Sequence, residues 1–372
     1  MKQAVILTDG QYKHTLAAAR SLSRRYRVVC GAPRPFAVSF FSNCVGSKFL
    51  YPSPGSDPKG FVATLESTAN EAKCSAVVPV GYEACLSLTR LHPGYSKVML
   101  PEREAMEIAA DKLRTMDFAK GAGIPVPETM QATGWQGVVD ASERFGSFFL
   151  KATQGSGQNR LVRRFNPEDP GIPRKFLSGD VKAIAQRIVR GDGYGFFGLF
   201  NRGKPRALFM HRRVREAGPD GGASTCAESV WDEDLRRNGL ALFGALGWHG
   251  VAMAEFKKDL DGKFRLLEIN PKFWGSLDLA IASGVDFPSL LVRCITEGDC
   301  EEVTTYRVGT RFQWPFPDDF SRVAWQPTAL GESMSELFST TTKKNLKLTD
   351  PLPTFVQGCQ LFLPAIRGAL RR

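Results

Sequence analysis

The sequence lacks the features that mark zinc-thiolate, secreted and membrane proteins. Its eight cysteines include no CxxC pair and no Cys/His cluster, so neither a zinc knuckle nor a redox dithiol of that kind is encoded. The N-terminal apolar run is only four residues long, far shorter than the hydrophobic region of a signal peptide. No apolar stretch reaches the roughly 20 residues that span a bilayer as a helix. We therefore expect a cytoplasmic protein without a transmembrane segment.

Two common nucleotide-binding loops are also absent. The pattern GxxxxGK[ST] does not occur, which excludes a Walker-type loop. The first predicted strand ends at Asp9-Gly10-Gln11, which lacks the GxGxxG spacing of a dinucleotide site. Residues 193–198 match GxGxxG formally, but the sequence after them predicts a hairpin where that fingerprint requires a helix. We therefore do not assign a nucleotide to residues 193–198.

Length, composition and charge describe an ordinary globular chain with a basic balance. The 372 residues suffice for roughly two or three domains, and 43% hydrophobic with 23% charged residues is typical of folded proteins. Lys plus Arg exceeds Asp plus Glu by 49 to 38, and the net charge of +11 favours anionic partners. The Phe-rich stretches are not interleaved with basic residues as in nucleic-acid-binding surfaces, so no specific nucleic acid is expected.

The hydrophobic pattern predicts an α/β unit followed by α+β structure. In the first hundred residues, strands at 4–8, 26–30 and 75–80 alternate with helices, which predicts a parallel sheet. Further along, short strands alternate with Gly-rich turns and occasional helices. We expect helices at 101–121, 180–188 and 232–246, short strands within 145–165, paired strands at 196–200 and 206–214, and a hairpin over 251–269.

Two acids are predicted to face each other across that last hairpin. Asp261-Gly262 favours a two-residue type I′ turn, and in that register Glu255 lies opposite Glu268, with Asn270 on the same face. Opposed carboxylates repel each other unless positive charge lies between them. Two acids and an amide oxygen suit Mg²⁺ or Mn²⁺, whose remaining positions water and phosphate can fill.

The alternative for this pair is an ion pair at the surface, in which one of the neighbouring lysines neutralises the acids. Glu268 lies in the apolar run 266–269, where a merely solvated acid is less expected, and we therefore prefer the metal site. A slip of one residue in the turn would separate the two acids. The lysines concerned are Lys257, Lys258 and Lys263.

Basic residues beside strands and turns are the candidates for phosphate binding. Lys151 follows the apolar run 148–150 and precedes a Gly/Ser turn, whose backbone N–H groups could hold a polyphosphate. The same turn could equally be an ordinary hairpin. In the basic run 211–215, strand alternation puts Arg212 on one face and Arg213 on the other, so that one face can serve a phosphate.

As an ordered set, these residues resemble the ATP-grasp superfamily, specifically its carboxylate-amine ligases. The resemblance covers roughly residues 100–300 and rests on Asp111-Lys112 with GIPVP, Lys151 with its loop, residues 186–191, and above all Glu255 with 268–272. It implies an ATP-grasp fold of mixed α/β and α+β class, in which an N-terminal α/β domain precedes two α+β subdomains that clasp ATP. The implied divisions are an N-terminal domain 1–100, a small subdomain with its lead-in helix 101–187, a large subdomain 188–310 and a C-terminal extension 311–372.

The resemblance also implies a role for each matching residue. Glu255, Glu268 and Asn270 would hold Mg²⁺, or Mn²⁺ in its place. The catalytic cations would be Lys272 and one of Arg212 and Arg213. The ATP-binding residues would be Lys112 and Lys151 at phosphate, Gly155 and Ser156 in the Gly-rich loop, Gln186, Arg187 and Ile188 at the adenine hinge, Asp192 at the ribose, and Leu267. The loop 221–224 resembles a segment that covers the phosphates, and its plain alternative is a turn.

The implied activity is ATP- and Mg²⁺-dependent ligation of a small carboxylate to an amine, amino acids among them, through an acyl phosphate. Two alternatives stay open. One is a carboxylase or phosphotransferase of the same superfamily. The other is a non-catalytic nucleotide- or nucleic-acid-binding protein. A homodimer is compatible with the sequence, which does not decide the oligomeric state.

Overall fold

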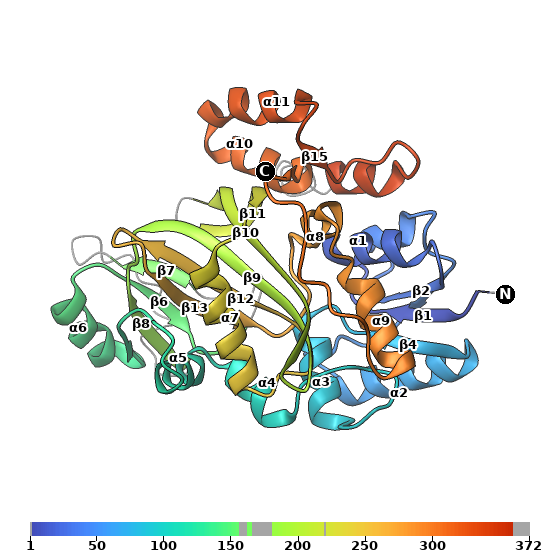
Figure 1. Cartoon of the computed structure of the whole chain (residues 1–372), viewed down its shortest axis with the longest axis horizontal. Helices are drawn as coiled ribbons and strands as arrows, with labels where there is room; N and C mark the ends of the chain where they lie inside the picture. The colour runs from blue at the N-terminus through green and yellow to red at the C-terminus, as the bar shows by residue number, and fades with distance from the viewer. Residues whose placement is uncertain (1, 156–161, 166–180, 219–220, 360–372) are drawn as a thin grey trace, which may run out of the picture.

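The computed structural model describes residues 2–155, 162–165, 181–218 and 221–359. It contains three sheets: a parallel sheet near the N-terminus, a small antiparallel sheet, and a large, mostly antiparallel sheet of seven strands (Figure 1). The predicted α/β and α+β class is therefore confirmed. The four predicted divisions of the chain stay a prediction.

The N-terminal parallel sheet has the order β3-β2-β1-β4. Strands β1, β2 and β4 are short, largely apolar runs that are mostly buried, as in parallel sheets whose two faces are covered by helices, whereas the edge strand β3 is partly exposed. The strands predicted at 4–8, 26–30 and 75–80 thus form, as β1, β2 and β4, with helices between them. Their bounds are β1 (Ala4–Leu7), α1 (Lys13–Leu22), β2 (Arg27–Ala32), η1 (Val38–Phe41), β3 (Ser47–Leu50), α2 (Pro58–Glu71), β4 (Cys74–Val78) and α3 (Tyr82–Leu91).

The single helix expected at 101–121 is two helices, α4 (Arg103–Ala110) and α5 (Lys112–Gly121). Asp111 separates them in an extended conformation, with φ −113° and ψ 118°. Its carboxylate accepts hydrogen bonds from the backbone N–H groups of Leu113 and Arg114, which makes it the N-cap of α5. The prediction of one helix was wrong because Asp111 starts a new helix, and this places Lys112 at its first position.

The small sheet has the order β5-β8-β6-β7, and α6 (Gly134–Phe145) packs on it. Its strands are β5 (Thr129–Gln131), β6 (Phe148–Ala152), β7 (Val162–Phe165) and β8 (Ala183–Arg187). The helix predicted at 180–188 is wrong. Residues 183–187 form a strand between β5 and β6, because pairing on both sides and burial of Ala183 and Ala185 decide the conformation of so short an apolar run.

The large sheet has the order β13-β12-β9-β10-β11-β14-β15. The predicted strand pair around the turn at 201–204 and the predicted helix at 232–246 are both confirmed. One face of the sheet packs against α7, and the other contributes to a core with α8 and α9. The elements are β9 (Gly191–Asn201), β10 (Lys204–Gly218), β11 (Gly221–Ser229), α7 (Glu233–Ala245), β12 (Gly250–Asp259), β13 (Phe264–Asn270), α8 (Leu277–Ser283), α9 (Phe287–Glu297), β14 (Arg311–Gln313) and β15 (Lys343–Lys344).

One hydrophobic cluster joins the N-terminal sheet to the large sheet. It contains Val5 and Val78 from the parallel strands, Phe197 and Phe209 from β9 and β10, and Trp274 from the segment before α8. The two sheets are therefore held through a common core, and not as separate bodies on a linker. A cleft at the junction of the two sheets therefore has walls formed by elements that pack on this shared core.

The last described segments lie above the large sheet (Figure 1). They comprise the π-helix η4 (Pro315–Asp319), α10 (Phe320–Trp325), the 3-10 turn η5 (Pro327–Ala329) and α11 (Leu330–Phe338). Asp319 is fully buried and forms an ion pair of 2.9 Å with Arg215 of β10. Arg20 of α1 binds Asp350 at 2.9 Å. Ion pairs thus tie the C-terminal segments to β10 of the large sheet and to α1 beside the N-terminal sheet.

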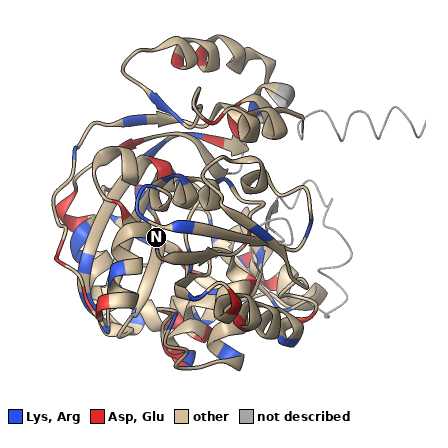
Figure 2. Cartoon of the chain, turned by 90° about the vertical axis from the view of Figure 1, so that its right-hand side faces the viewer, with Lys and Arg blue, Asp and Glu red and all other residues tan. Residues whose placement is uncertain are grey.

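In the described part of the chain, no single helix is long and apolar enough to cross a membrane. Only α8 and α9 together have the length and composition, as a pair bent by 87°, and much of their apolar surface lies in the core. Basic and acidic residues are mixed along the elements in Figure 2, so the net positive charge does not collect in one block of the view.

Candidate active site

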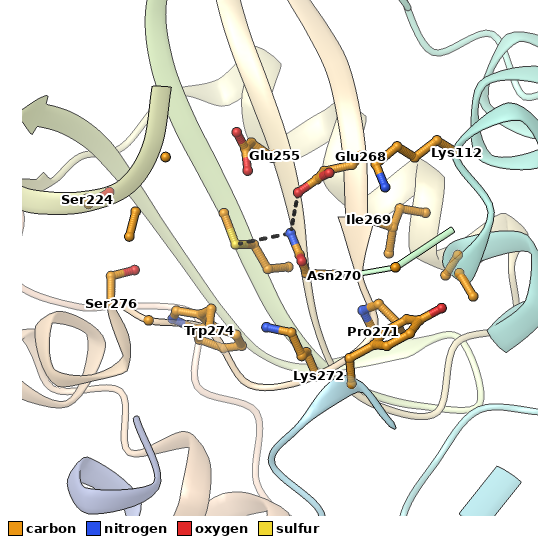
Figure 3. A pocket seen from close by; sticks show the side chains of 18 of the residues that line it. Lys112, Ser224, Glu255, Glu268, Ile269, Asn270, Pro271, Lys272, Trp274 and Ser276 are labelled. Carbon is orange, nitrogen blue, oxygen red and sulfur yellow. Dashed lines mark hydrogen bonds between the residues drawn. The ribbon is translucent and has the colours of Figure 1, made fainter. Parts of the chain in front are cut away.

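A pocket of about 350 Å³ lies between the large sheet, Tyr82 beside the N-terminal sheet, the junction of α4 and α5, and Gly155 after β6. Tyr82 and the end of α4 line it from one side, and strands β10 to β13 form its floor. Figure 3 shows the side chains of β12 and β13 pointing into this space. Seven residues predicted from the sequence line it together: Lys112, Gly155, Arg213, Glu255, Glu268, Asn270 and Lys272.

The predicted pairing of Glu255 with Glu268 is confirmed. The prediction of a two-residue turn, from which that pairing was inferred, is wrong. Lys258 pairs with Phe264, and the backbone N–H of Asp259 donates to the carbonyl of Lys263 at 2.9 Å, so the loop is one residue longer than expected. The ladder shifts by one residue between Glu255 and Phe256. That bulge restores the register beyond it and leaves the two acids face to face.

The acid pair and Asn270 bring two carboxylates and an amide together in the pocket. Glu268 is buried, with 5% of its surface exposed, and its Oε1 accepts a hydrogen bond of 3.1 Å from Nδ2 of Asn270 (Figure 3). Among the described residues there is no group of three or more His, Cys, Asp or Glu side chains suited to a metal. Two carboxylates and an amide fit a Mg²⁺ ion that takes its other ligands from water and substrate phosphates. They do not fit a closed protein cage.

Arg213 is the basic residue of β10 that enters the pocket. Its Nη2 lies 2.8 Å from Oε2 of Glu255, and its Nη1 lies 2.6 Å from Oε1 of Glu216. Burial disfavours the charge on Arg213, but the two carboxylates outweigh burial and raise its pKa. A Cβ at Gly193 would lie 2.9 Å from Cδ of Arg213, so the glycine on β9 makes room for this side chain.

Arg212, the neighbouring candidate, points away from the acid pair. It is 43% exposed and lies 3.6 Å from Glu228 and 3.9 Å from Asp192. Of the hairpin lysines considered as partners of the acids, Lys258 instead binds Asp232 at 2.8 Å. The cation that contacts Glu255 therefore comes from β10, a strand distant in sequence.

Two lysines approach the acids from other walls of the pocket. Lys112 is 6% exposed, and its backbone N–H donates to the carbonyl of Thr153 at 2.8 Å, which ties the start of α5 to the end of β6. Lys272 follows β13, and its Nζ donates to the carbonyl of Phe273 at 3.2 Å. In Figure 3 these two side chains lie on different sides of Glu268 and Asn270. The pocket therefore has Lys112, Arg213 and Lys272 around one pair of carboxylates.

Lys151 and Gln186 are brought together in the small sheet, outside the wall of this pocket. Nζ of Lys151 donates to Oε1 of Gln186 at 2.6 Å, and Nε2 of Gln186 donates to Oγ1 of Thr129 at 3.3 Å. Both Lys151 and Gln186 are at least 95% buried. A carbonyl oxygen has two lone pairs, so an adenine amino group could still donate to Gln186.

The other predicted nucleotide-binding residues that the structure describes do not line the pocket. Arg187 is 54% exposed and binds Glu128 at 2.8 Å, while Ile188 begins the short connection from β8 to β9. Asp192 is 66% exposed, beside Arg212. Leu267 is the extra residue of the bulge in β13. Ser156 lies outside the described residues.

Sequence reasoning missed several pocket residues, among them Tyr82, His211 and Trp274. Tyr82 begins α3, directly after the C-terminal end of β4, where parallel sheets commonly place ligand-binding residues. His211 could have been found from Arg213, because residues two apart in a strand share a face. The segment 221–224, expected as a loop over the phosphates or a turn, begins β11, and its residues 222–224 line the pocket.

Comparisons with known proteins agree with this architecture. Residues 208–315 match the family described as "ATP-grasp in the biosynthetic pathway with Ter operon". No curated protein sequence matches the chain significantly. Among solved structures, biotin carboxylase from Campylobacter jejuni is 14% identical, with a TM-score of 0.64 over 84% of this chain and 74% of that one.

Two further solved structures show the same likeness. N5-carboxyaminoimidazole synthetase from Staphylococcus aureus is 15% identical, with a TM-score of 0.65 over 84% of this chain and 82% of that one. L-amino acid ligase from Bacillus licheniformis is 16% identical, with a TM-score of 0.61 over 80% of this chain and 74% of that one. At such identities the likeness establishes the fold, and the family match over β10 to β14 points to the same group. The chain therefore has the ATP-grasp fold, and its residues 208–315 match an ATP-grasp family.

Proposed function

We propose that the protein is an ADP-forming ligase that joins a small-molecule carboxylate to an amine at the expense of ATP. The observation that carries this proposal is the acid pair Glu255 and Glu268, placed with Asn270 among the cations Lys112, Arg213 and Lys272 in one pocket. Positive groups around an acid pair fit a triphosphate bound through Mg²⁺. The fold, shared with carboxylases and amino acid ligases, supports the same reaction class.

In the first proposed step, a carboxylate oxygen of the substrate attacks the γ-phosphorus of ATP, and ADP leaves as the bond to the bridging oxygen breaks. Mg²⁺ held by Glu255, Glu268 and Asn270 would neutralise part of the phosphate charge. Arg213 and Lys272 would place positive charge beside the negative charge on the transferred phosphoryl group. Lys112 orients the phosphates from the start of α5.

In the second proposed step, an uncharged amine attacks the acyl carbon, the carbon–oxygen bond to phosphate breaks, and the nitrogen loses a proton. This chemistry needs positioning and charge neutralisation and no side-chain nucleophile. The walls of the pocket, formed by elements of two domains around a shared core, would hold both substrates in place and limit access of water to the acyl phosphate.

A carboxylase is the second candidate, because biotin carboxylase and N5-carboxyaminoimidazole synthetase share the fold. In that case bicarbonate takes the place of the organic carboxylate. ADP release that depends on bicarbonate alone would favour this candidate over the ligase.

The proposal is tested by measuring ADP release with a panel of amino acids and small carboxylates, with hydroxylamine as the surrogate amine. Hydroxamate formed together with ADP is expected, because hydroxylamine traps an acyl phosphate. The Glu255→Gln protein should form neither product. ATP binding without ADP release for any carboxylate or for bicarbonate would instead support a non-catalytic nucleotide-binding protein.

A further inference from the structure

The floor of the pocket carries two buried rings whose polar atoms have no partner among the described residues. His211 is 1% exposed, and neither of its ring nitrogens has a hydrogen-bond partner there. Trp274 is 2% exposed, and its Nε1 likewise has none. Both residues line the pocket. A buried polar atom without a partner is destabilising, so the pairing of these atoms with a ligand would be favourable.

His211 lies in the same row of the sheet as the acid pair. On β10 it pairs with Gly195 of β9, which pairs with Glu255 of β12, which in turn pairs with Glu268 of β13. A Cβ at Gly195 would lie 2.8 Å from Cδ2 of His211, so the glycine leaves the space that the imidazole occupies. Two strand spacings, roughly 10 Å, separate the backbones of His211 and Glu255.

Both rings rest on Phe197. Its ring centroid is 4.7 Å from that of His211 and 4.5 Å from that of Trp274. Trp274 also packs edge-on against Phe287 at 5.0 Å. Aromatic contacts therefore fix the orientation of both rings, and the polar atoms take no part in holding them. Rigid, unpaired donors and acceptors of this kind are what a specific binding site needs.

The charges around this floor restrict what can bind. Burial, with a smaller effect from Arg213, lowers the pKa of His211 to about 3, so its imidazole is neutral near pH 7. A neutral imidazole has one donor and one acceptor, and the indole has one donor. The carboxylates that line the pocket are Glu255 and Glu268, which the proposed function assigns to the metal. An ammonium group bound here would face Arg213 and Lys272 without a carboxylate of its own.

We propose that His211 and Trp274 form a specificity subsite for the carboxylate substrate, and that this substrate is an acid bearing a neutral hydroxyl or carboxamide group close to its reacting carboxylate. The proposal rests on the proposed ligase function and narrows its substrate class. A hydroxyl or carboxamide can both donate to the imidazole and accept from the indole, whereas an alkyl group can do neither. Free α-amino acids, with their ammonium group, are disfavoured as the activated acid.

The test compares propionate, L-lactate, malonamate and L-alanine as acids with ATP, Mg²⁺ and hydroxylamine. We expect L-lactate or malonamate to exceed propionate and L-alanine at least about tenfold in kcat/KM, the factor expected for one hydrogen bond. Trp274→Phe and His211→Leu should each abolish that preference and leave the KM for ATP unchanged. Trp248→Phe is the control, because Trp248 is a buried tryptophan outside the pocket.

A preference for L-alanine, or a preference that survives in both variants, would overturn the subsite. The failure of the proposed function gives a different result, namely no ADP release with any of the acids. In that case calorimetry of the same four acids with the ADP-Mg²⁺ complex of the protein decides. Tighter binding of L-lactate or malonamate that is lost in His211→Leu supports the subsite, and equal binding of all four overturns it.

Discussion

Glu255 on β12 and Glu268 on β13 lie directly opposite each other because two irregularities of one residue cancel. The loop after Asp259 shifts the pairing by one residue, and the bulge at Leu267 shifts it back. The bulge also turns Glu268 to the pocket side, although Leu266, two residues earlier, is buried in the core behind the sheet. Bulges often re-aim a side chain next to a functional site in this way.

Binding of ATP should stabilise the folded protein, and the effect should require a divalent cation. A ligand that binds only the folded state adds about 2.7 kcal/mol at a hundredfold excess over its Kd. We expect the melting temperature to rise with ATP and Mg²⁺ and to change little with ATP and EDTA. NAD⁺ is the control nucleotide, and an equal shift with NAD⁺ would argue against the assignment of the site to ATP.

Replacement of Lys151 by methionine should weaken nucleotide binding. The substitution removes a buried cation from the small sheet and keeps the apolar stem of the side chain. It also removes the donor 2.6 Å from Oε1 of Gln186, so a loss of about 1–3 kcal/mol in the unfolding free energy is expected. Calorimetry should give an ATP Kd raised about tenfold or more. Unchanged affinity in the folded variant would limit Lys151 to a structural role.

Arg213 and Arg212 should differ sharply when each is replaced by methionine. Arg213 contacts Glu255 in the pocket, whereas Arg212 lies on the opposite face of β10 and is 43% exposed. We expect Arg213→Met to reduce ADP release about a hundredfold or more, a typical effect for the loss of a charge that stabilises a transition state. Arg212→Met should retain activity within about twofold. Similar losses in both variants would contradict this assignment.

The buried pair of Arg215 and Asp319 should hold the C-terminal segments to the sheet. Asp319→Asn removes one charge of a pair that is at least 98% buried, and we expect a loss of about 3 kcal/mol in the unfolding free energy measured with urea at pH 7. The control is Glu332→Gln, because Glu332 lies 3.6 Å from Arg215 and is 51% exposed. Its effect should stay below about 1 kcal/mol.

The same pair predicts a pH dependence. Burial alone would raise the pKa of Asp319, but hydrogen bonds from Arg215 and Gln313 outweigh it and lower the pKa on folding. The stabilisation is therefore complete above the unfolded pKa of about 4 and is lost as the pH falls through the lower folded pKa. The difference between the parent protein and Asp319→Asn should shrink as the pH falls below about 4. A difference that grows in that range would contradict the direction of the shift.

Much of the fold and half of the candidate site follow from local sequence signals. Alternation and short apolar runs predict β9, β10, β12 and β13. The facing of the two acids was predicted from a two-residue turn that does not form, and it holds because the bulge in β13 offsets the longer loop. Contacts distant in sequence could not be predicted: the entry of Arg213 from β10 depends on the glycine at 193, and the position of His211 depends on the glycine at 195. The strand β8 was mistaken for a helix because only its two neighbours in the sheet distinguish the alternatives.

The central claim is that Glu255 and Glu268 hold a metal for phosphoryl transfer, and Glu268→Gln tests it most directly. Gln keeps the shape and the oxygen that accepts from Asn270, so the unfolding free energy of the ligand-free protein should stay within about 1 kcal/mol of the parent value. ADP release should fall at least about a hundredfold, because one metal-binding charge is lost. Glu228→Gln, on the opposite face of the sheet, is the control. A Glu268→Gln protein that is destabilised without metal but fully active would contradict the account.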